Sequence, residues 1–217
     1  MSARRTHAAL GAAVLVWLSA VGCGHIGEGS DDTQSRPDPI EPAPGIAVTT
    51  SQHIPPNATR CVVTPGDDGE EIVAAVADPT APRITIRVPD GWTAEEGTGD
   101  IALAMSGPHS MSATVRIAPT DPTPESAFLR YTAALGGAMQ RLKFVVTGAQ
   151  FCGYSSEILS GTLRGDSARI DFADRITHIR TNTSYFLVTI HVEAPGDTAE
   201  FGAAKSVLLQ DFGVVIP

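Results

Sequence analysis

Alternation of apolar and polar residues at a period of two constrains the fold of this chain more than any other feature of its sequence. Ile84, Ile86 and Val88 alternate with threonine and arginine up to a turn at 89–91, which is the pattern of a half-buried β-strand. Further strand-like runs occupy residues 101–105, 111–117, 144–146, 156–163, 168–179, 185–192 and 214–216. Because turn-forming residues separate neighbouring runs, we expect hairpins and an antiparallel sheet.

Two segments have the three- and four-residue spacing of amphipathic helices. The first opens at 123–125 with an N-cap threonine, a proline and an acid, and its apolar face consists of Phe128, Tyr131, Leu135 and Met139. The second opens at 197–200 with a capping-box-like pattern, and its apolar stripe consists of Phe201, Ala204, Leu208 and Phe212. These elements predict an α+β fold, an antiparallel β-sheet packed with helices.

The last predicted hairpin turns at 181–183 and has apolar residues on both faces. Its core face is expected to carry Phe186, Val188, Ile190 and Val192. Because Tyr185 and Leu187 on the opposite face are also apolar, that face should be partly covered. A turn near Thr183 would place His191 opposite about Arg175, so His178 and His191 would not converge on one metal ion.

The first 22 residues have the three parts of an export signal: two arginines near the start, an apolar run at 8–21 and small residues at 19–22. The apolar run is shorter than the roughly 20 residues that a permanent membrane span needs. We therefore predict a lipoprotein signal peptide at 1–22, and no later segment is long and apolar enough to span.

Cys23 follows this signal directly. The sequence Ala20-Val21-Gly22-Cys23 resembles the bacterial lipobox, so we predict export, cleavage before Cys23 and lipidation of its thiol. Two or three acyl chains would hold the protein stably on the outer face of the cell membrane. Leucine is usual where this chain has Ala20, and ordinary secretion with an incidental cysteine is the alternative.

The mature chain divides by composition into a tether at 23–60 and a single globular α+β domain at 61–217. The tether is rich in proline, glycine and acids, which bury too little apolar surface to offset their ordering entropy. Since the signal holds two arginines and no acid, maturation leaves 13 basic and 24 acidic side chains and a net charge of −11. A nucleic-acid partner is therefore not expected, because such binding depends on clustered lysine and arginine.

Two cysteines, Cys61 and Cys152, remain after Cys23. An exported protein occupies a compartment that permits disulfides, and we predict that these two cysteines are paired. Two buried free thiols are the alternative.

Catalytic signatures are absent from the sequence. It contains no Gly-x-Ser-x-Gly, no His-Glu-x-x-His and no phosphate-binding glycine loop, and the acids at 66–71 lack the spacing of a calcium loop. Asp166, Asp171 and Asp174 invite a glycosidase-like carboxylate pair, but interleaved arginines favour an exposed strand face with matched charges. We therefore predict no catalytic residue, no metal and no cofactor.

The segment Ile84-Thr85-Ile86-Arg87-Val88-Pro89-Asp90-Gly91-Trp92, together with the lipobox and the tether, resembles the mycobacterial LpqN and LpqT type of envelope lipoproteins. In that family a strand ending in Val-Pro-x-x-Trp opens a PsbP-like domain, an α/β/α sandwich. The resemblance covers about residues 80–217. It implies a non-catalytic envelope protein that contacts mycolate-lipid transport machinery or holds an apolar ligand, and it carries over no functional residue.

Three hypotheses for function follow. The leading one is a membrane-anchored binding or accessory module whose partner is a lipid or an envelope membrane protein. An apolar cavity between sheet and helix would support a lipid, and a solid core with an exposed apolar patch would support a protein. The second is an envelope hydrolase that uses Asp171, Asp174 or His178, and the third is a structural surface antigen.

Overall fold

The computed structural model describes residues 43–48, 53–65, 69–138, 142–149, 151–164 and 168–217. All of them belong to one compact unit, Glu41–Pro217. The predicted signal peptide at 1–22, Cys23 and most of the tether lie outside these residues. Within them, no helix has the length and apolarity that crossing a membrane requires.

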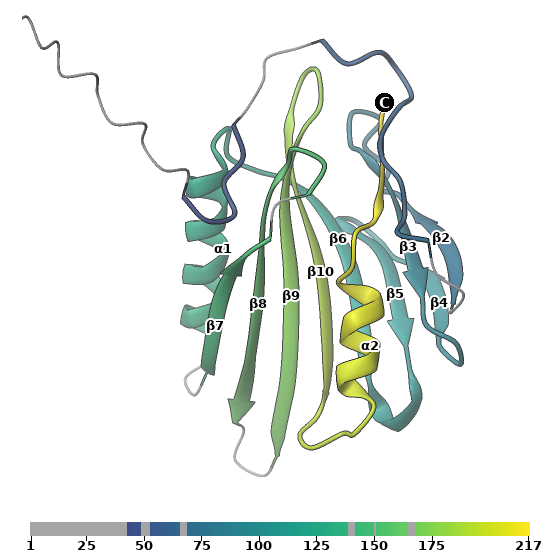
Figure 1. Cartoon of the computed structure of the whole chain (residues 1–217), viewed down its shortest axis with the longest axis vertical. Helices are drawn as coiled ribbons and strands as arrows, with labels where there is room; N and C mark the ends of the chain where they lie inside the picture. The colour runs from purple at the N-terminus through teal and green to yellow at the C-terminus, as the bar shows by residue number, and fades with distance from the viewer. Residues whose placement is uncertain (1–42, 49–52, 66–68, 139–141, 150, 165–167) are drawn as a thin grey trace, which may run out of the picture. The chain divides into compact units, whose positions relative to one another are not determined.

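Seven antiparallel strands form the larger sheet (Figure 1), and their pairing confirms the predicted hairpins. Their order across the sheet is β4 (Thr93–Glu96), β5 (Ile101–Ser106), β6 (Ser112–Pro119), β10 (Tyr185–Pro195), β9 (Arg169–Arg180), β8 (Ser155–Arg164) and β7 (Leu142–Gly148). A single turn of 3₁₀ helix, η1 (Pro108–Ser110), joins β5 to β6.

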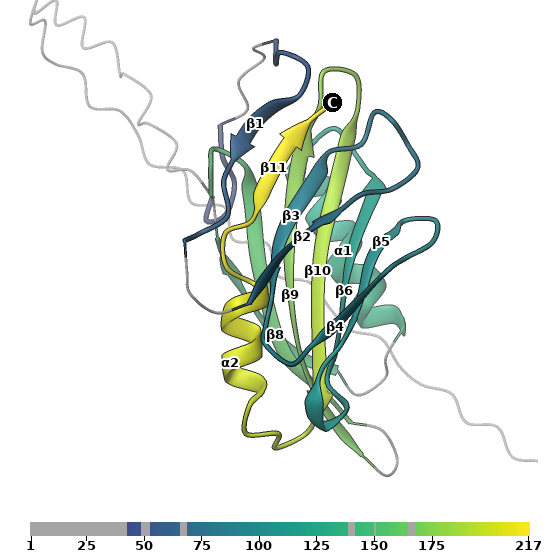
Figure 2. The ribbon, with the colours of Figure 1, turned by 90° about the vertical axis from the view of Figure 1, so that its right-hand side faces the viewer.

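A second, four-stranded antiparallel sheet was not expected from the sequence. Its order is β1 (Ala58–Cys61), β11 (Gly213–Ile216), β3 (Arg83–Val88) and β2 (Glu70–Ala74), as Figure 2 shows. The boundary expected at residue 61 between tether and domain therefore falls inside β1. Glu70 and Glu71, two of the acids at 66–71 that lack the spacing of a calcium loop, belong to β2, and both side chains are exposed.

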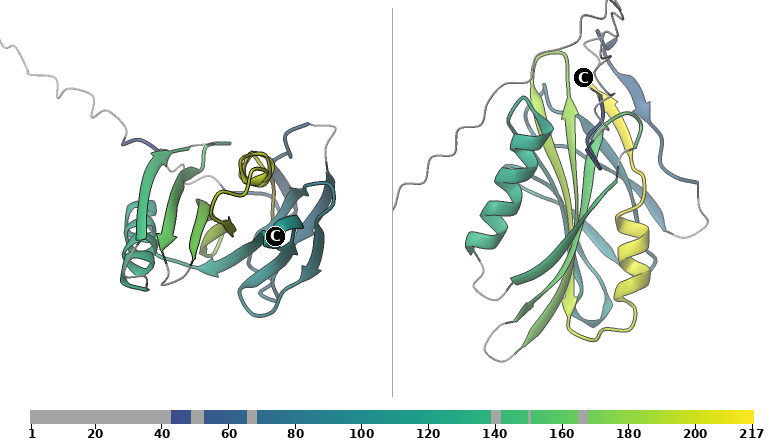
Figure 3. Two further views of the ribbon diagram at one scale, coloured as in Figure 1. Left: turned by 90° about the horizontal axis from the view of Figure 1, so that it is seen from below. Right: turned by 60° about the vertical axis from the view of Figure 1, so that its left-hand side comes forward.

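The main hydrophobic core lies between the two sheets, and apolar residues of both sheets and of α2 (Phe201–Leu208) form it. The other helix, α1 (Pro124–Ala138), lies on the far side of the larger sheet (Figure 3). We call the side of the larger sheet under α1 its helix face and the other its core face. The α+β class is thus confirmed, with a second sheet facing the core.

Helix α1 covers part of the helix face. Phe128 of α1 packs with Leu159 and Ile176 of the sheet, and Leu187 of β10 joins this cluster. The predicted covering of the second face of the last hairpin is therefore confirmed. The Thr123 hydroxyl accepts a hydrogen bond from the Ser126 N–H at 3.4 Å, as expected of an N-cap. Met139, predicted on the same helix, lies outside the described residues.

The predicted capping box of the second helix is wrong. The Thr198 hydroxyl donates to the Pro195 carbonyl at 2.7 Å, which closes a turn before the helix instead of capping it. Helix α2 begins at Phe201, and Glu200 at its N-cap makes no side-chain capping bond.

The register of the last hairpin differs from the prediction by one residue. Tyr185 pairs with Arg180, so His191 lies opposite Asp174 and not Arg175. The exposed, charge-matched strand face predicted for the carboxylates is also wrong for Asp174 and Arg175. Both are buried, with relative exposures of 0% and 4%, because α1 lies over the helix face and the second sheet over the core face. Asp166 lies outside the described residues.

Candidate functional site: a pocket beside the disulfide

A disulfide joins the two sheets at one end of the domain. Cys61 ends β1 in the smaller sheet, and Cys152 lies in the turn between β7 and β8, with the two Cα atoms 5.9 Å apart. The Tyr154 N–H closes this turn on the Phe151 carbonyl at 2.8 Å. Cys152 and Gly153 have φ angles of 51° and 77°, the signs that a type I′ hairpin turn requires. The predicted pairing of Cys61 with Cys152 is thus present in the structure.

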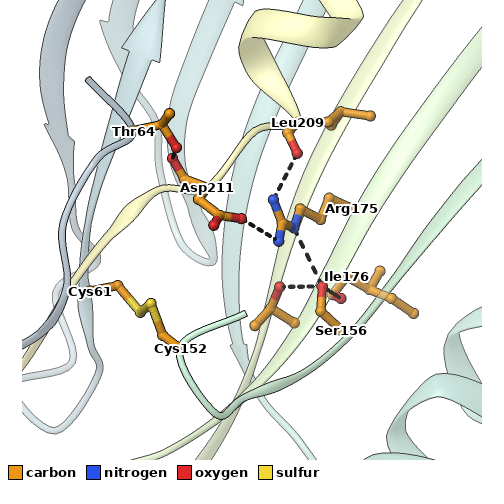
Figure 4. A network of polar contacts seen from close by, with 9 residues as sticks. Cys61, Thr64, Cys152, Ser156, Arg175, Ile176, Leu209 and Asp211 are labelled. Carbon is orange, nitrogen blue, oxygen red and sulfur yellow. Dashed lines mark hydrogen bonds and ion pairs between the residues drawn. A yellow bond between two sulfur atoms is a disulfide. The ribbon is translucent and has the colours of Figure 1, made fainter. Parts of the chain in front are cut away.

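Arg175 of β9 braces the same turn from the core side (Figure 4). Its guanidinium donates to the Leu209 carbonyl at 2.8 Å, to Asp211 Oδ1 at 2.9 Å and to Ser156 Oγ at 3.4 Å. It also lies 4.3 Å from the centre of the Phe151 ring, close enough for a cation–π contact. Arg175 therefore links the larger sheet to the segment between α2 and β11, and supports the residue next to Cys152.

A pocket of about 190 Å³ lies beside the disulfide. Cys152 contributes to its wall, and so do its neighbours Gly153 and Tyr154. Arg60, the residue before Cys61, also lines the pocket. The full lining among described residues is Ala47, Val48, Ile54, Arg60, Cys152, Gly153, Tyr154, Ser155, His178 and Arg180. This lining contains two arginines and no acid.

Tyr154 has a buried hydroxyl with no hydrogen-bond partner among the described residues. Burial raises the pKa of Tyr154, and the positive charge and donor groups of Arg60 partly oppose that rise. The phenol therefore stays protonated at neutral pH and keeps its O–H donor.

His178 lines the pocket as a neutral ring. Burial lowers the pKa of His178, although the carbonyl of Asp121 and the charges of Glu125 and Asp121 act in the opposite direction. Its Nε2 atom lies 2.8 Å from the Asp121 carbonyl, and the ring is tilted against Tyr185. A neutral imidazole is consistent with Nε2–H donating to that carbonyl.

A second polar cluster lies on the helix face. His191 Nδ1 is 2.5 Å from Asp174 Oδ1, and its Nε2 is 3.5 Å from Glu193 Oε2. Burial opposes the charged ring, but Asp174 and Glu193 outweigh it and raise the pKa of His191. The Ser112 hydroxyl donates to Glu193 at 3.1 Å, so it is directed to a carboxylate and not to the imidazole.

The three side chains of the hydrolase hypothesis do not meet. Asp171 pairs with Arg169 at 2.9 Å, Asp174 pairs with His191, and His178 bonds to a backbone carbonyl. Within the described part of the chain, no group of three or more His, Cys, Asp or Glu residues is placed to hold a metal ion.

The space between α1 and the helix face is small. It measures about 20 Å³ and is lined by Leu135, Leu163, Ile170, Phe172, His191 and Glu193, whereas sites for small organic ligands occupy roughly 300 Å³ or more. The described residues of α1 and of the helix face therefore do not form the cavity that would have supported an enclosed lipid.

Sequence reasoning missed Arg60, Tyr154 and Arg180. A signal for the first two was present, because Arg60 precedes Cys61 and Tyr154 follows Cys152 by two residues. A disulfide brings its sequence neighbours together, so the predicted pairing already implied that these side chains would be close.

Fold and site together define a class: a two-sheet α+β domain, closed by a disulfide at one end and carrying a basic pocket beside it. No protein-family model and no curated protein matches the chain. Among solved structures, it is similar to LpqN of Mycobacterium tuberculosis, described as involved in cell envelope biogenesis. That match has a TM-score of 0.56 and 16% identity, and covers 67% of this chain and 91% of LpqN.

A Pseudomonas aeruginosa protein of unknown function, PA94, also matches, with 11% identity over 64% of this chain and 92% of that chain. Its TM-score of 0.33 is too low to support an argument. The fold of this chain is therefore distantly LpqN-like.

Proposed function

We propose that this protein is a lipid-anchored accessory module of a bacterial cell envelope, which binds a lipid or an envelope protein and catalyses no reaction. The LpqN-like fold carries the proposal, because LpqN is described as involved in cell envelope biogenesis. In this scheme Cys23 anchors the chain on the outer face of the membrane, and the proline-rich segment after it spaces the domain from the bilayer.

The disulfide supports an exported location, because bonds of this kind form and persist outside the reducing cytosol. The separation of Asp171, Asp174 and His178 supports binding over hydrolysis, since carboxylate catalysis needs two groups on one substrate.

A protein partner has more support than a lipid enclosed under α1. The space under α1 is only about 20 Å³, while Val145 and Val146 are 67% and 45% exposed on β7. Strand β7 is an edge of the larger sheet, and an edge strand with exposed apolar side chains can add a strand or a surface from a partner.

The test is mass spectrometry of the molecules that copurify with the natively processed chain from the membranes of a mycobacterial host. The Cys23→Ala chain from the same host serves as the control. We expect one lipid or one envelope protein to be enriched with the native chain. A native chain that carries no more than the background seen with an unrelated lipoprotein would contradict the proposal.

A further inference from the structure

We propose that the pocket beside the disulfide binds an oxyanion, a carboxylate or phosphate group, presented by a small or amphiphilic molecule. This inference rests on the proposed binding function and names the class of ligand for one site of that function.

The charge of the pocket is opposite to that of the protein. The chain has a formal net charge of −9, yet the described lining holds Arg60 and Arg180 and no acid. Five other arginines pair with carboxylates: Arg87, Arg116, Arg130, Arg169 and Arg175. Arg60 makes no ion pair with a described residue, although acids outnumber bases. A pocket lined by this guanidinium and by no described acid is suited to an external anion.

The second observation is the Tyr154 hydroxyl, which is buried without a partner among the described residues. A buried O–H that finds no acceptor is costly. Arg60 lies close enough to act on the Tyr154 pKa, but a guanidinium has only donors and offers the O–H no acceptor. An oxyanion held by Arg60 would supply that acceptor.

The walls of the pocket are held in place before any ligand binds. The disulfide ties together the backbones next to Arg60 and Tyr154, since Arg60 precedes Cys61 and Tyr154 follows Cys152 by two residues, and Arg175 packs on Phe151 at the start of the turn. Preorganised donors lose less entropy on binding, and the guanidinium fork matches the two oxygens of a carboxylate or phosphate.

The size of the pocket limits what enters it. A volume of about 190 Å³ accommodates a headgroup and excludes an acyl chain of membrane length. Ile54 and Val48 line the same pocket, and Val48 is 80% exposed, so the carbon portion of the ligand would lie against them at the mouth.

The experiment is calorimetric titration of the natively processed, oxidised protein in a neutral detergent. The probes are inorganic phosphate, butyrate and dihexanoyl phosphatidic acid, and neutral dihexanoylglycerol is the control. We expect saturable binding of at least one oxyanion and none of the neutral lipid. Binding of phosphatidic acid without phosphate or butyrate would indicate a lipid headgroup as the source, and binding of the free anions would indicate a soluble ligand. No saturation by any oxyanion up to about 10 mM, or equal binding of the neutral lipid, would overturn the inference.

Variants locate the binding. Arg60→Ala and Tyr154→Phe should each weaken the affinity about tenfold, since each removes a donor to a charged group. Arg116→Ala, which removes an exposed arginine paired with Asp100, should leave it unchanged. Tyr154→Phe keeps the ring and hence the fold, which its unfolding midpoint verifies. Unchanged affinity in both pocket variants would refute this site. The proposed function is tested separately, by the copurification experiment.

Discussion

Arg175 shows how a single buried side chain ties the domain together. It donates to the Leu209 carbonyl and to Asp211, and it packs on Phe151. Burial lowers the pKa of Arg175 below its ordinary value, and the hydrogen bond and charge of Asp211 partly offset this, but an arginine remains charged at neutral pH. Its contacts join β9 to the segment before β11 and to the turn that carries Cys152.

Arg175→Ala should therefore lower the free energy of unfolding by about 3 kcal/mol, because it leaves a buried carbonyl without its donor and removes packing from Phe151. Arg116→Ala, at an exposed ion pair, should cost less than about 1 kcal/mol. Urea denaturation of both variants measures the difference. Equal costs would show that the Arg175 contacts add nothing beyond a surface ion pair.

His191 should make stability depend on pH. Its pKa is raised in the folded protein, where burial is outweighed by Asp174 and Glu193. A raised pKa stabilises the fold fully below the unfolded-state value near 6.5, and that stabilisation disappears as the pH rises through the folded-state value.

We therefore expect the stability advantage of the native chain over His191→Gln to be largest below about pH 6.5 and to shrink as the pH rises above it. Urea titrations of both proteins across this range measure it. His178, whose pKa is lowered, contributes a pH dependence of the opposite sign. That contribution cancels when the free energy of unfolding of the variant is subtracted from that of the native chain. An advantage that stays constant with pH, or grows as pH rises, would contradict the assigned ion pair.

At the scale of elements, α1 contains two glycines that lower its stability and that its packing does not require. Gly136 and Gly137 lie in its last part with nothing within 4 Å of an added Cβ. Glycine costs about 0.5–1 kcal/mol relative to alanine inside a helix. Gly136→Ala should therefore stabilise the domain by about that amount in thermal or urea unfolding.

Gly148→Ala is the matched control, because there the same substitution should lower the free energy of unfolding instead of raising it. An added Cβ on Gly148 would lie 2.4 Å from the backbone nitrogen of Gly45, so the variant should lose about 1–3 kcal/mol. Destabilisation by Gly136→Ala would mean that α1 makes contacts which its open surface does not show.

Elements with clear periodicity were predictable from the sequence, and short edge elements were not. The long strands β9 and β10 alternate over many residues, whereas β1 is four residues long and has exposed side chains at Thr59 and Arg60. Its partner β11 lies more than 150 residues away in the chain. No local sequence pattern predicts a pairing between strands so far apart in the chain.

Register and burial were the other limits. A one-residue slip changes every partner in a hairpin, and the turn near Thr183 could not be placed closely enough to separate Asp174 from Arg175 as the partner of His191. Charged residues on a strand indicate solvent exposure when one face of the sheet is not covered by other elements. Here both faces are covered, so Asp174 and Arg175 are buried on opposite sides of one strand.

At the scale of the whole molecule, the disulfide holds the smaller sheet to the larger one across a sequence separation of 91. Closing a loop of this length removes about 4–5 kcal/mol of unfolded-chain entropy in the simplest treatment. The double variant Cys61→Ser, Cys152→Ser should lose a free energy of unfolding of that order. Adding a reductant should destabilise the native protein and leave the double variant unaffected, and equal stability of the two proteins would count against the bridge as a stabilising link.

The anchor and the bridge can be examined together, because both change the mass of the natively processed protein. The most direct test is the intact mass of the protein isolated from a mycobacterial host, with and without a thiol-alkylating reagent. We predict a chain that begins at Cys23, carries a diacylglycerol group and has no alkylatable thiol at Cys61 or Cys152. An unlipidated chain, or one whose first residue is not Cys23, would contradict the account of an envelope-anchored module.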